Sequence, residues 1–253
     1  MIYYHQILLK DIQTSRKMNV RKVALFVEGM TEQVFVRDFL LKWYDWDTNR
    51  VGIDCYKLYS DSQSTAPYTY GNNESENYFQ IFDVGNDAKV LSVILSRADG
   101  LQKAGYSMVV GLRDMFSEAY TIKTIKRNGS RTIDQDLNDR FIQGVNDVIN
   151  NNSKDISIYI QFAIMEVEAW LLGMPKFFEQ LSGINDPESD IYHPAAKLEE
   201  LRQAEGLTYQ KHREEIEGIM GSISKEDYLA LIDSGRCKSF KNFVDVLLSP
   251  MYY

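Results

Sequence analysis

Short apolar runs alternate with segments of helical periodicity along the first two thirds of the chain. The run at 21–28 is apolar on both faces, which is typical of a buried strand in a parallel sheet. A polar stretch at 60–76 is expected to form a long loop. Further strands are predicted at 51–59, 106–112 and 156–164, and helices at about 31–43, 87–104 and 133–149. This alternation predicts an α/β fold with a mostly parallel sheet flanked by helices.

The pattern changes after residue 175, where charged helical segments follow one another and strand signals are few. We therefore expect an N-terminal extension at 1–20, an α/β domain at 21–175 and a helical C-terminal region at 176–253 packed on that domain. Met18 stands just before the first strand. The first 17 residues are accordingly either an added strand or arm that packs on the domain, or a segment that is not translated because translation starts at Met18 rather than at Met1.

The composition is that of an ordinary globular protein, with 44% hydrophobic and 25% charged residues. No run approaches the ~18 apolar residues that a membrane-spanning helix needs, and the N-terminus does not resemble a secretory signal. The two cysteines lie far apart in sequence, which favours a reducing, cytoplasmic location. A net charge of −8 argues against a protein that coats nucleic acid, although a local basic patch remains compatible with it.

Acidic residues stand at the carboxyl ends of three predicted strands: Glu28, Asp114, and the pair Glu166 and Glu168. In open α/β sheets, ligands bind in the crevice outside these ends. Carboxylates without histidine or cysteine are the ligands that Mg²⁺ prefers. One such acid alone is more often a helix cap or a solvated loop residue. The three positions together predict a site for Mg²⁺ or Mn²⁺.

The geometry of the pair is open at this point. If the last strand continues, Glu166 and Glu168 share a side and both can bind one ion. If a helix begins at Met165, the two side chains diverge by about 200° and at most one can bind it. Glu32 is interpreted as a first-turn residue of the helix that Thr31 caps, rather than as a ligand.

Candidate contacts to phosphate lie beside these acids and in one basic segment. Gly29 lets the backbone turn tightly or a phosphate come near. Arg113 either holds a carboxylate, contacts a phosphate or is a surface cation. The segment at 121–131 is interpreted as a loop that contacts phosphate or is merely solvated. Its cations are Lys123, Lys126, Arg127 and Arg131.

Several segments resemble a known family. FVEGMTEQVFVRDFL at 26–40 resembles the first motif of the TOPRIM fold, and MVVGLRDMF at 108–116 is similar to the strand that carries the TOPRIM aspartates. Further segments resemble a bacterial family of unknown function in the TOPRIM-like group. They are MEVEAWLLG at 165–173, YHPAAKLEEL at 192–201, the pair Tyr209 and Lys211, and CKSFKNFVDVLL at 237–248. The resemblance covers nearly all of residues 21–248.

The resemblance implies that Glu28 matches the TOPRIM glutamate and Asp114 the first aspartate. The usual second aspartate is Phe116 here, so Glu118 would substitute imperfectly, or Glu166 or Glu168 would complete the site. TOPRIM folds serve topoisomerases, primases, OLD-type nucleases and related defence proteins. No tyrosine stands out as a nucleophile, which disfavours strand passage.

We therefore expect a Mg²⁺-dependent phosphoryl-transfer enzyme, a nuclease acting on DNA or RNA, with Glu28 as a metal ligand or a general base. The resemblance implies a prokaryotic setting such as anti-phage defence. Two alternatives stay open. The chain could be a degenerate TOPRIM-like binding module that acts with a partner such as an ATPase, because position 116 lacks the second aspartate. It could also be a small-molecule phosphohydrolase or a nucleotide-binding protein.

Overall fold

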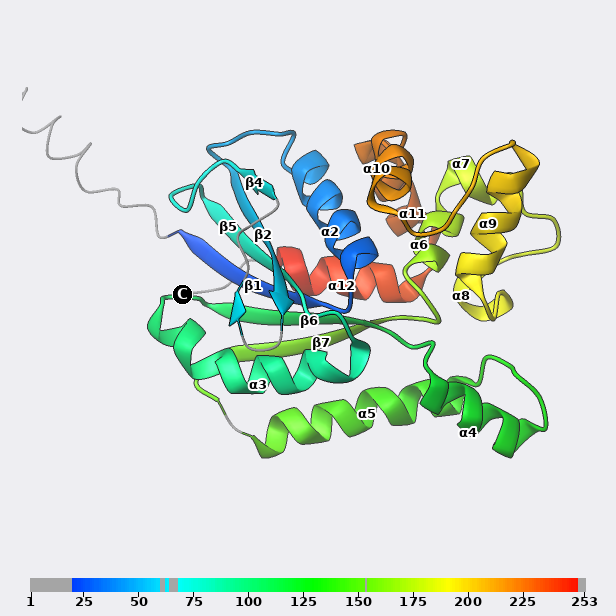
Figure 1. Ribbon diagram of the computed structural model, residues 1–253, viewed down its shortest axis with the longest axis horizontal. Coiled ribbons are helices and arrows are strands. Elements are labelled where there is room, and N and C mark those ends of the chain that lie inside the picture. The colour runs from blue at the N-terminus through cyan, green and yellow to red at the C-terminus, as the bar shows by residue number, and fades with distance from the viewer. Residues whose placement is uncertain (1–19, 60–61, 64–67, 153, 250–253) are drawn as a thin grey trace, which may run out of the picture.

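The sheet is mostly parallel and carries helices on both faces (Figure 1). The computed structural model describes residues 20–59, 62–63, 68–152 and 154–249. The strand order is β3-β2-β5-β1-β6-β7, and β4 pairs with β2. The strands are β1 (Arg21–Val27), β2 (Val51–Tyr59), β3 (Ser62–Gln63), β4 (Tyr68–Tyr70), β5 (Asn77–Asp83), β6 (Met108–Asp114) and β7 (Ser157–Ala163). The α/β fold with a mostly parallel sheet is therefore confirmed.

The sequence pattern missed one central strand. β5 lies between β2 and β1 and is parallel to both. It follows directly on the polar stretch at 60–76, which hides its start. That stretch is not one loop, because β3 and β4 within it pair antiparallel with β2. The predicted extension at 1–20 lies outside the described residues, apart from residue 20.

Four helices follow the strands of the α/β part: α2 (Met30–Trp43), α3 (Asp87–Lys103), α4 (Glu118–Asn128) and α5 (Gln135–Asn151). α2 covers one face of the sheet, whereas α3 and α5 cover the other (Figure 1). The segment interpreted as a basic loop is mostly α4, which Ser117 caps and which Gly129 ends in a left-handed conformation. Three of its four cations therefore stand on a helix.

The C-terminal helices pack on the same face as α2. They are α6 (Glu168–Gly173), α7 (Pro175–Phe178), α8 (Pro187–Asp190), α9 (Pro194–Ala204), α10 (Arg213–Gly221), α11 (Lys225–Ser234) and α12 (Lys238–Leu248). Trp170 of α6 is fully buried, and its ring contacts those of Phe35 in α2 and Phe240 in α12. The apolar residues of α2, α6 and α12 thus belong to one hydrophobic core with that face of the sheet. No described helix is long and apolar enough to cross a bilayer.

The connections that follow the neighbouring strands β1 and β6 leave the sheet in opposite directions. β5 pairs with one edge of β1 and β6 with the other. The helix after β1 packs on one face, and the helices after β6 pack on the opposite face (Figure 1). Connections that leave in opposite directions open a crevice outside the carboxyl ends of these two strands, which is where open α/β sheets bind ligands.

Candidate functional site

The acids predicted from the sequence meet at this crevice. Glu28 follows β1 directly, and Asp114 is the last residue of the neighbouring β6. The backbone N–H of Asp114 donates a hydrogen bond to Glu28 Oε2 at 3.3 Å. Asp114 Oδ1 in turn accepts from the backbone N–H of Val167 at 3.0 Å. This bond holds the segment after β7 against the end of β6.

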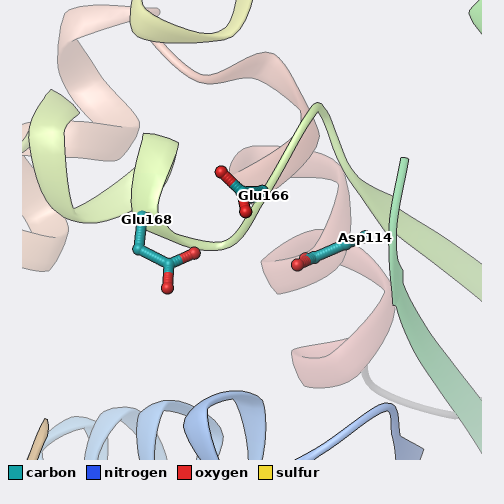
Figure 2. A group of neighbouring side chains, drawn as sticks. All are labelled: Asp114, Glu166 and Glu168. Carbon is teal, nitrogen blue, oxygen red and sulfur yellow. The ribbon is translucent and has the colours of Figure 1, made fainter. Parts of the chain in front are cut away.

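That segment follows neither of the two geometries considered for Glu166 and Glu168. β7 ends at Ala163, and α6 begins only at Glu168. Between them Met165 adopts a left-handed φ of 58°, a conformation that is uncommon outside glycine and that redirects the chain. One carboxylate oxygen from each of Asp114, Glu166 and Glu168 lies within 4.8 Å of the others (Figure 2). Both glutamates therefore reach the same point as Asp114.

Protein donors hold two of these carboxylates in place. Glu166 Oε2 accepts from the backbone N–H of Ala195 at 2.9 Å, in the first turn of α9, and lies 3.0 Å from His193 Nδ1. Glu168 is fully buried, and its Oε1 accepts from the Tyr209 hydroxyl at 2.6 Å. Glu168 Oε2 is buried and has no hydrogen-bond partner among the described residues. Native proteins seldom leave a buried polar atom unpaired, so this oxygen marks a place for a ligand.

Lys211 is a cation within this cluster. Its Nζ lies 2.7 Å from Glu168 Oε1 and 3.8 Å from Glu166 Oε1. Burial alone would lower the pKa of Lys211, but Glu168, followed by Glu166 and Asp114, raises it instead. Lys211 is therefore charged and offsets part of the negative charge.

Glu32 also belongs to the cluster, contrary to its interpretation as a helix residue only. It does lie in the first turn of α2, yet it is 5% exposed. Burial, together with Glu168 and Glu28, raises the pKa of Glu32 to about 8. Burial also raises the pKa of Asp114, and the charge on Glu32 adds to this effect. These carboxyls are crowded enough to retain protons that a cation would displace.

A pocket of about 360 Å³ opens beside the acids. Gly29 lines it and caps α2 in an extended conformation. A Cβ at Gly29 would lie 3.3 Å from Glu32 Oε2, so glycine keeps this wall open. The described residues that line the pocket are Glu28, Gly29, Met30, Thr31, Glu32, Lys57, Asp83, Gly85, Asp114 and Lys211. Asp83 and Lys57 come from β5 and β2, so the pocket extends across the ends of four strands.

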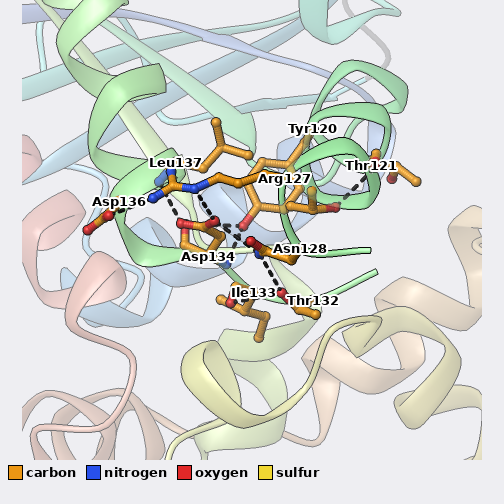
Figure 3. Close-up of polar contacts among 10 residues, drawn as sticks. Tyr120, Thr121, Arg127, Asn128, Thr132, Ile133, Asp134, Asp136 and Leu137 are labelled. Atoms are coloured by element: carbon orange, nitrogen blue, oxygen red, sulfur yellow. Dashed lines mark hydrogen bonds and ion pairs between the residues drawn. The ribbon is translucent and has the colours of Figure 1, made fainter. Parts of the chain in front are cut away.

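The other predicted phosphate contacts lie elsewhere. Arg113 alternates with Asp114 along β6, and its guanidinium lies 5.5 Å from the centre of the Phe162 ring on the opposite face of the sheet. The four cations of 121–131 do not line the acidic pocket. Arg127 forms ion pairs with Asp134 and Asp136, at 3.3 and 2.7 Å (Figure 3). The basic segment and the acids are thus two separate surfaces.

Phe116, the position where the sequence resemblance implies an aspartate, packs against two aromatic rings. Its ring stacks on that of His193, with centroids 4.6 Å apart, and meets Tyr192 edge-on at 5.6 Å. The stack holds His193 beside Glu166. Glu118, the other candidate replacement, is exposed in the first turn of α4 and does not line the pocket. Glu166 and Glu168, which follow β7, lie close to Asp114 instead.

The donor set fits a hard divalent cation. The atoms that converge are carboxylate oxygens, and one of them is a buried oxygen without a partner. Comparison with protein-family models, with curated proteins and with solved structures finds no match for this chain. The geometry of the residues themselves therefore carries the functional argument.

Proposed function

We propose that this protein is a divalent-cation-dependent phosphoryl-transfer enzyme that hydrolyses phosphodiester bonds in DNA or RNA. The observation that carries the proposal is the convergence of Asp114, Glu166 and Glu168, with one buried oxygen unpaired, beside an open pocket. The resemblance of residues 26–40 and 108–116 to TOPRIM motifs supports the same chemistry.

Asp114, Glu166 and Glu168 would hold Mg²⁺ or Mn²⁺. When bound, such an ion polarises the phosphodiester, lowers the pKa of a water molecule and stabilises the leaving oxygen. Glu28 lines the pocket, where its carboxylate can accept a proton from an attacking water or complete the ligand set. The hydrogen bond from the backbone N–H of Asp114 fixes its orientation.

The surroundings of the pocket favour an anionic substrate despite the net charge of the chain. Lys57 and Lys211 both line the pocket, and Lys211 pairs with Glu168 at 2.7 Å. Two cations at the rim can contact the phosphates that flank the bond to be cleaved. Lys123, Lys126 and Arg131 extend from the connection after β6, and they offer further contacts to a substrate longer than a nucleotide.

The test is cleavage of labelled DNA and RNA by the purified chain, with Mg²⁺, with Mn²⁺ and with a chelator. We expect cleavage that requires a divalent ion and is lost in Glu28→Gln and Asp114→Asn. Glu118→Gln is the matched control, because Glu118 follows the same strand but lies outside the pocket. Cleavage that survives chelation, or that Glu118→Gln abolishes as strongly, would contradict the proposal.

A second candidate is a binding module without catalysis, and one observation favours it. Phe116 packs on His193 where a second aspartate would bind metal, and Lys211 already offsets charge in the cluster. Such a module would act through a partner, for example an ATPase. It predicts no cleavage with any divalent ion and a stable complex with that partner in size-exclusion chromatography.

Turnover of free nucleotides without cleavage of polymers would instead indicate a small-molecule phosphohydrolase.

A further inference from the structure

The loop between α9 and α10 is built to place one ammonium group among the acids. Glu215 in the first turn of α10 accepts from the Thr208 hydroxyl at 2.5 Å and from the backbone N–H groups of Gln210 and His212, at 2.7 and 3.2 Å. We call these three hydrogen bonds to Glu215 the clamp. Lys211 lies between Gln210 and His212, whose N–H groups are bound in it, and has a left-handed φ of 58°. A non-glycine residue adopts this conformation at a cost, so the surrounding contacts impose it.

The clamp directs two side chains onto the same oxygen. Tyr209 and Lys211 both reach Glu168 Oε1, at 2.6 and 2.7 Å. The tyrosine donates a neutral hydrogen bond, whereas the lysine supplies a full positive charge. Glu168 is fully buried, so its carboxylate needs such a counter-charge. Its Oε2 stays unpaired among the described residues and is available to a different ligand.

The position of Lys211 Nζ resembles that of a cation shared between carboxylates. Nζ lies 2.7 Å from Glu168 and 3.8 Å from Glu166, two members of the trio that could hold a metal ion. Two-metal phosphodiesterases place two ions roughly 3.5–4 Å apart between bridging carboxylates. An ammonium group carries one positive charge rather than two, but it competes with a divalent ion for the carboxylate oxygens of Glu166 and Glu168.

We propose that Lys211 takes the place of a second metal ion, so that the site binds a single Mg²⁺ or Mn²⁺ held by Asp114, Glu166 and Glu168. This inference rests on the proposed function, because it assumes that the trio binds a divalent ion. In two-metal enzymes the second ion supplies positive charge to the scissile phosphate. Here the fixed ammonium of Lys211 supplies that charge, because Lys211 lines the pocket.

The experiment counts bound Mn²⁺ in the full chain by isothermal titration calorimetry and by electron paramagnetic resonance. We expect one ion in the wild type, two in Lys211→Met and one in Lys211→Arg, which keeps the charge. Two ions in Lys211→Met also give spin–spin coupling between neighbouring Mn²⁺ ions. Since Lys211→Met leaves Glu168 buried without a counter-charge, its melting temperature should rise more on addition of Mn²⁺ than that of the wild type.

The remaining outcomes separate the two proposals. Two ions in the wild type, or a single ion in both the wild type and Lys211→Met, overturn the role of Lys211 and leave the proposed function standing. No ion in either protein overturns the metal site itself. Ions in Lys211→Met but none in the wild type also overturn the inference, because the lysine would then replace the metal altogether.

Lys211→Met could fail to fold without metal, and Glu215→Ala then takes its place. Glu215 is partly exposed and does not line the pocket, and its loss removes the hydrogen bonds that hold the loop while leaving the lysine in the chain. We expect a second, weaker Mn²⁺ site in Glu215→Ala. A single site with wild-type affinity would overturn the inference.

Discussion

Two buried glutamates, Glu168 and Glu188, have different surroundings. Glu188 Oε1 accepts from Trp170 Nε1 at 3.1 Å and from the Ser239 hydroxyl, and its Oε2 accepts from the backbone N–H of Ser239 at 3.1 Å. Both of its oxygens are thus satisfied by neutral donors. Glu168 has a charged partner on one oxygen, none among the described residues on the other, and acids nearby.

The difference separates a carboxyl with a purely structural environment from one in the proposed metal site. Burial raises the pKa of Glu188 to about 7, while Ser239 and Trp170 oppose the rise by hydrogen bonding. A carboxyl with complete hydrogen bonding and no charged partner ties α8 to α6 and α12. A carboxyl that is crowded by other acids and incompletely bonded has an oxygen free to bind a further cation. The two environments should therefore respond differently to mutation, pH and metal.

The largest effect is expected from removing the structural carboxyl. Glu188→Ala removes the acceptor of the Ser239 hydroxyl and of the Ser239 backbone N–H, whereas Trp170 Nε1 still donates to Ser239 Oγ at 2.8 Å. Each buried donor that loses its acceptor costs about 1–3 kcal/mol. We expect the free energy of unfolding to fall by about 3 kcal/mol or more, measured by urea denaturation. Exposed Glu179→Ala is the control and should change little. A loss under about 1 kcal/mol would show that Glu188 is not a structural anchor.

The next effect concerns pH. The pKa of Glu188 is about 7 in the folded protein and 4.5 as its ordinary value, so the folded state binds the proton more tightly. Its contribution to stability is complete below pH 4.5 and is lost as pH rises through 7, by at most roughly 3 kcal/mol. Glu188→Gln should remove this part of the pH dependence in urea titrations from pH 4.5 to 8. An unchanged slope would contradict the environment assigned to Glu188.

Divalent ions should distinguish the two regions directly. A ligand at 100 times its dissociation constant stabilises the folded state by about 2.7 kcal/mol, so Mn²⁺ should raise the melting temperature of the wild type. We expect this rise to vanish in Asp114→Asn and to persist in Glu188→Gln, measured by differential scanning calorimetry. Equal rises in both variants would mean that Mn²⁺ binds elsewhere.

The smallest effect is expected from relieving the crowding without metal. Asp114→Asn removes a charge beside Glu32 and Glu168 but keeps an acceptor for the backbone N–H of Val167. The free energy of unfolding should stay unchanged or rise by about 1 kcal/mol in the presence of a chelator. Asp114→Ala should be less stable than Asp114→Asn, because it also loses this hydrogen bond. A loss beyond about 2 kcal/mol in Asp114→Asn would point to a structural role.

The sequence predicted which strand ends form the site, but it did not predict all of the residues that meet there. Glu28 and Asp114 stand at the ends of apolar strands, and parallel strands bring their carboxyl ends to one edge of a sheet. Glu32 could have been included, since it follows Glu28 by only four residues across the short connection at Gly29. Its position in a first turn offered a simpler explanation, namely a favourable interaction with the helix dipole.

Other contributions left only a weak signal in the sequence. Lys211 lies 43 residues after Glu168 and appeared only as the second half of a Tyr-x-Lys pair. Its contact with Glu168 depends on the clamp by Glu215 and on a left-handed backbone. Met165 likewise needs a left-handed conformation that no glycine announces. The strand β5 was missed because it follows directly on a polar stretch that was interpreted as a loop, so the start of the strand has no clear boundary in the sequence.

The sequence by itself determined the α/β class and which acids end their strands, because hydrophobic periodicity and chain direction are local properties. Only the tertiary structure decided that both Glu166 and Glu168 reach Asp114, that Glu32 joins them, and that Lys211 stands among them. These facts depend on backbone turns and on contacts between distant segments, which local patterns do not encode. The physical reason is that burial and proximity set the charge state of a carboxyl, and both arise only when the chain is folded.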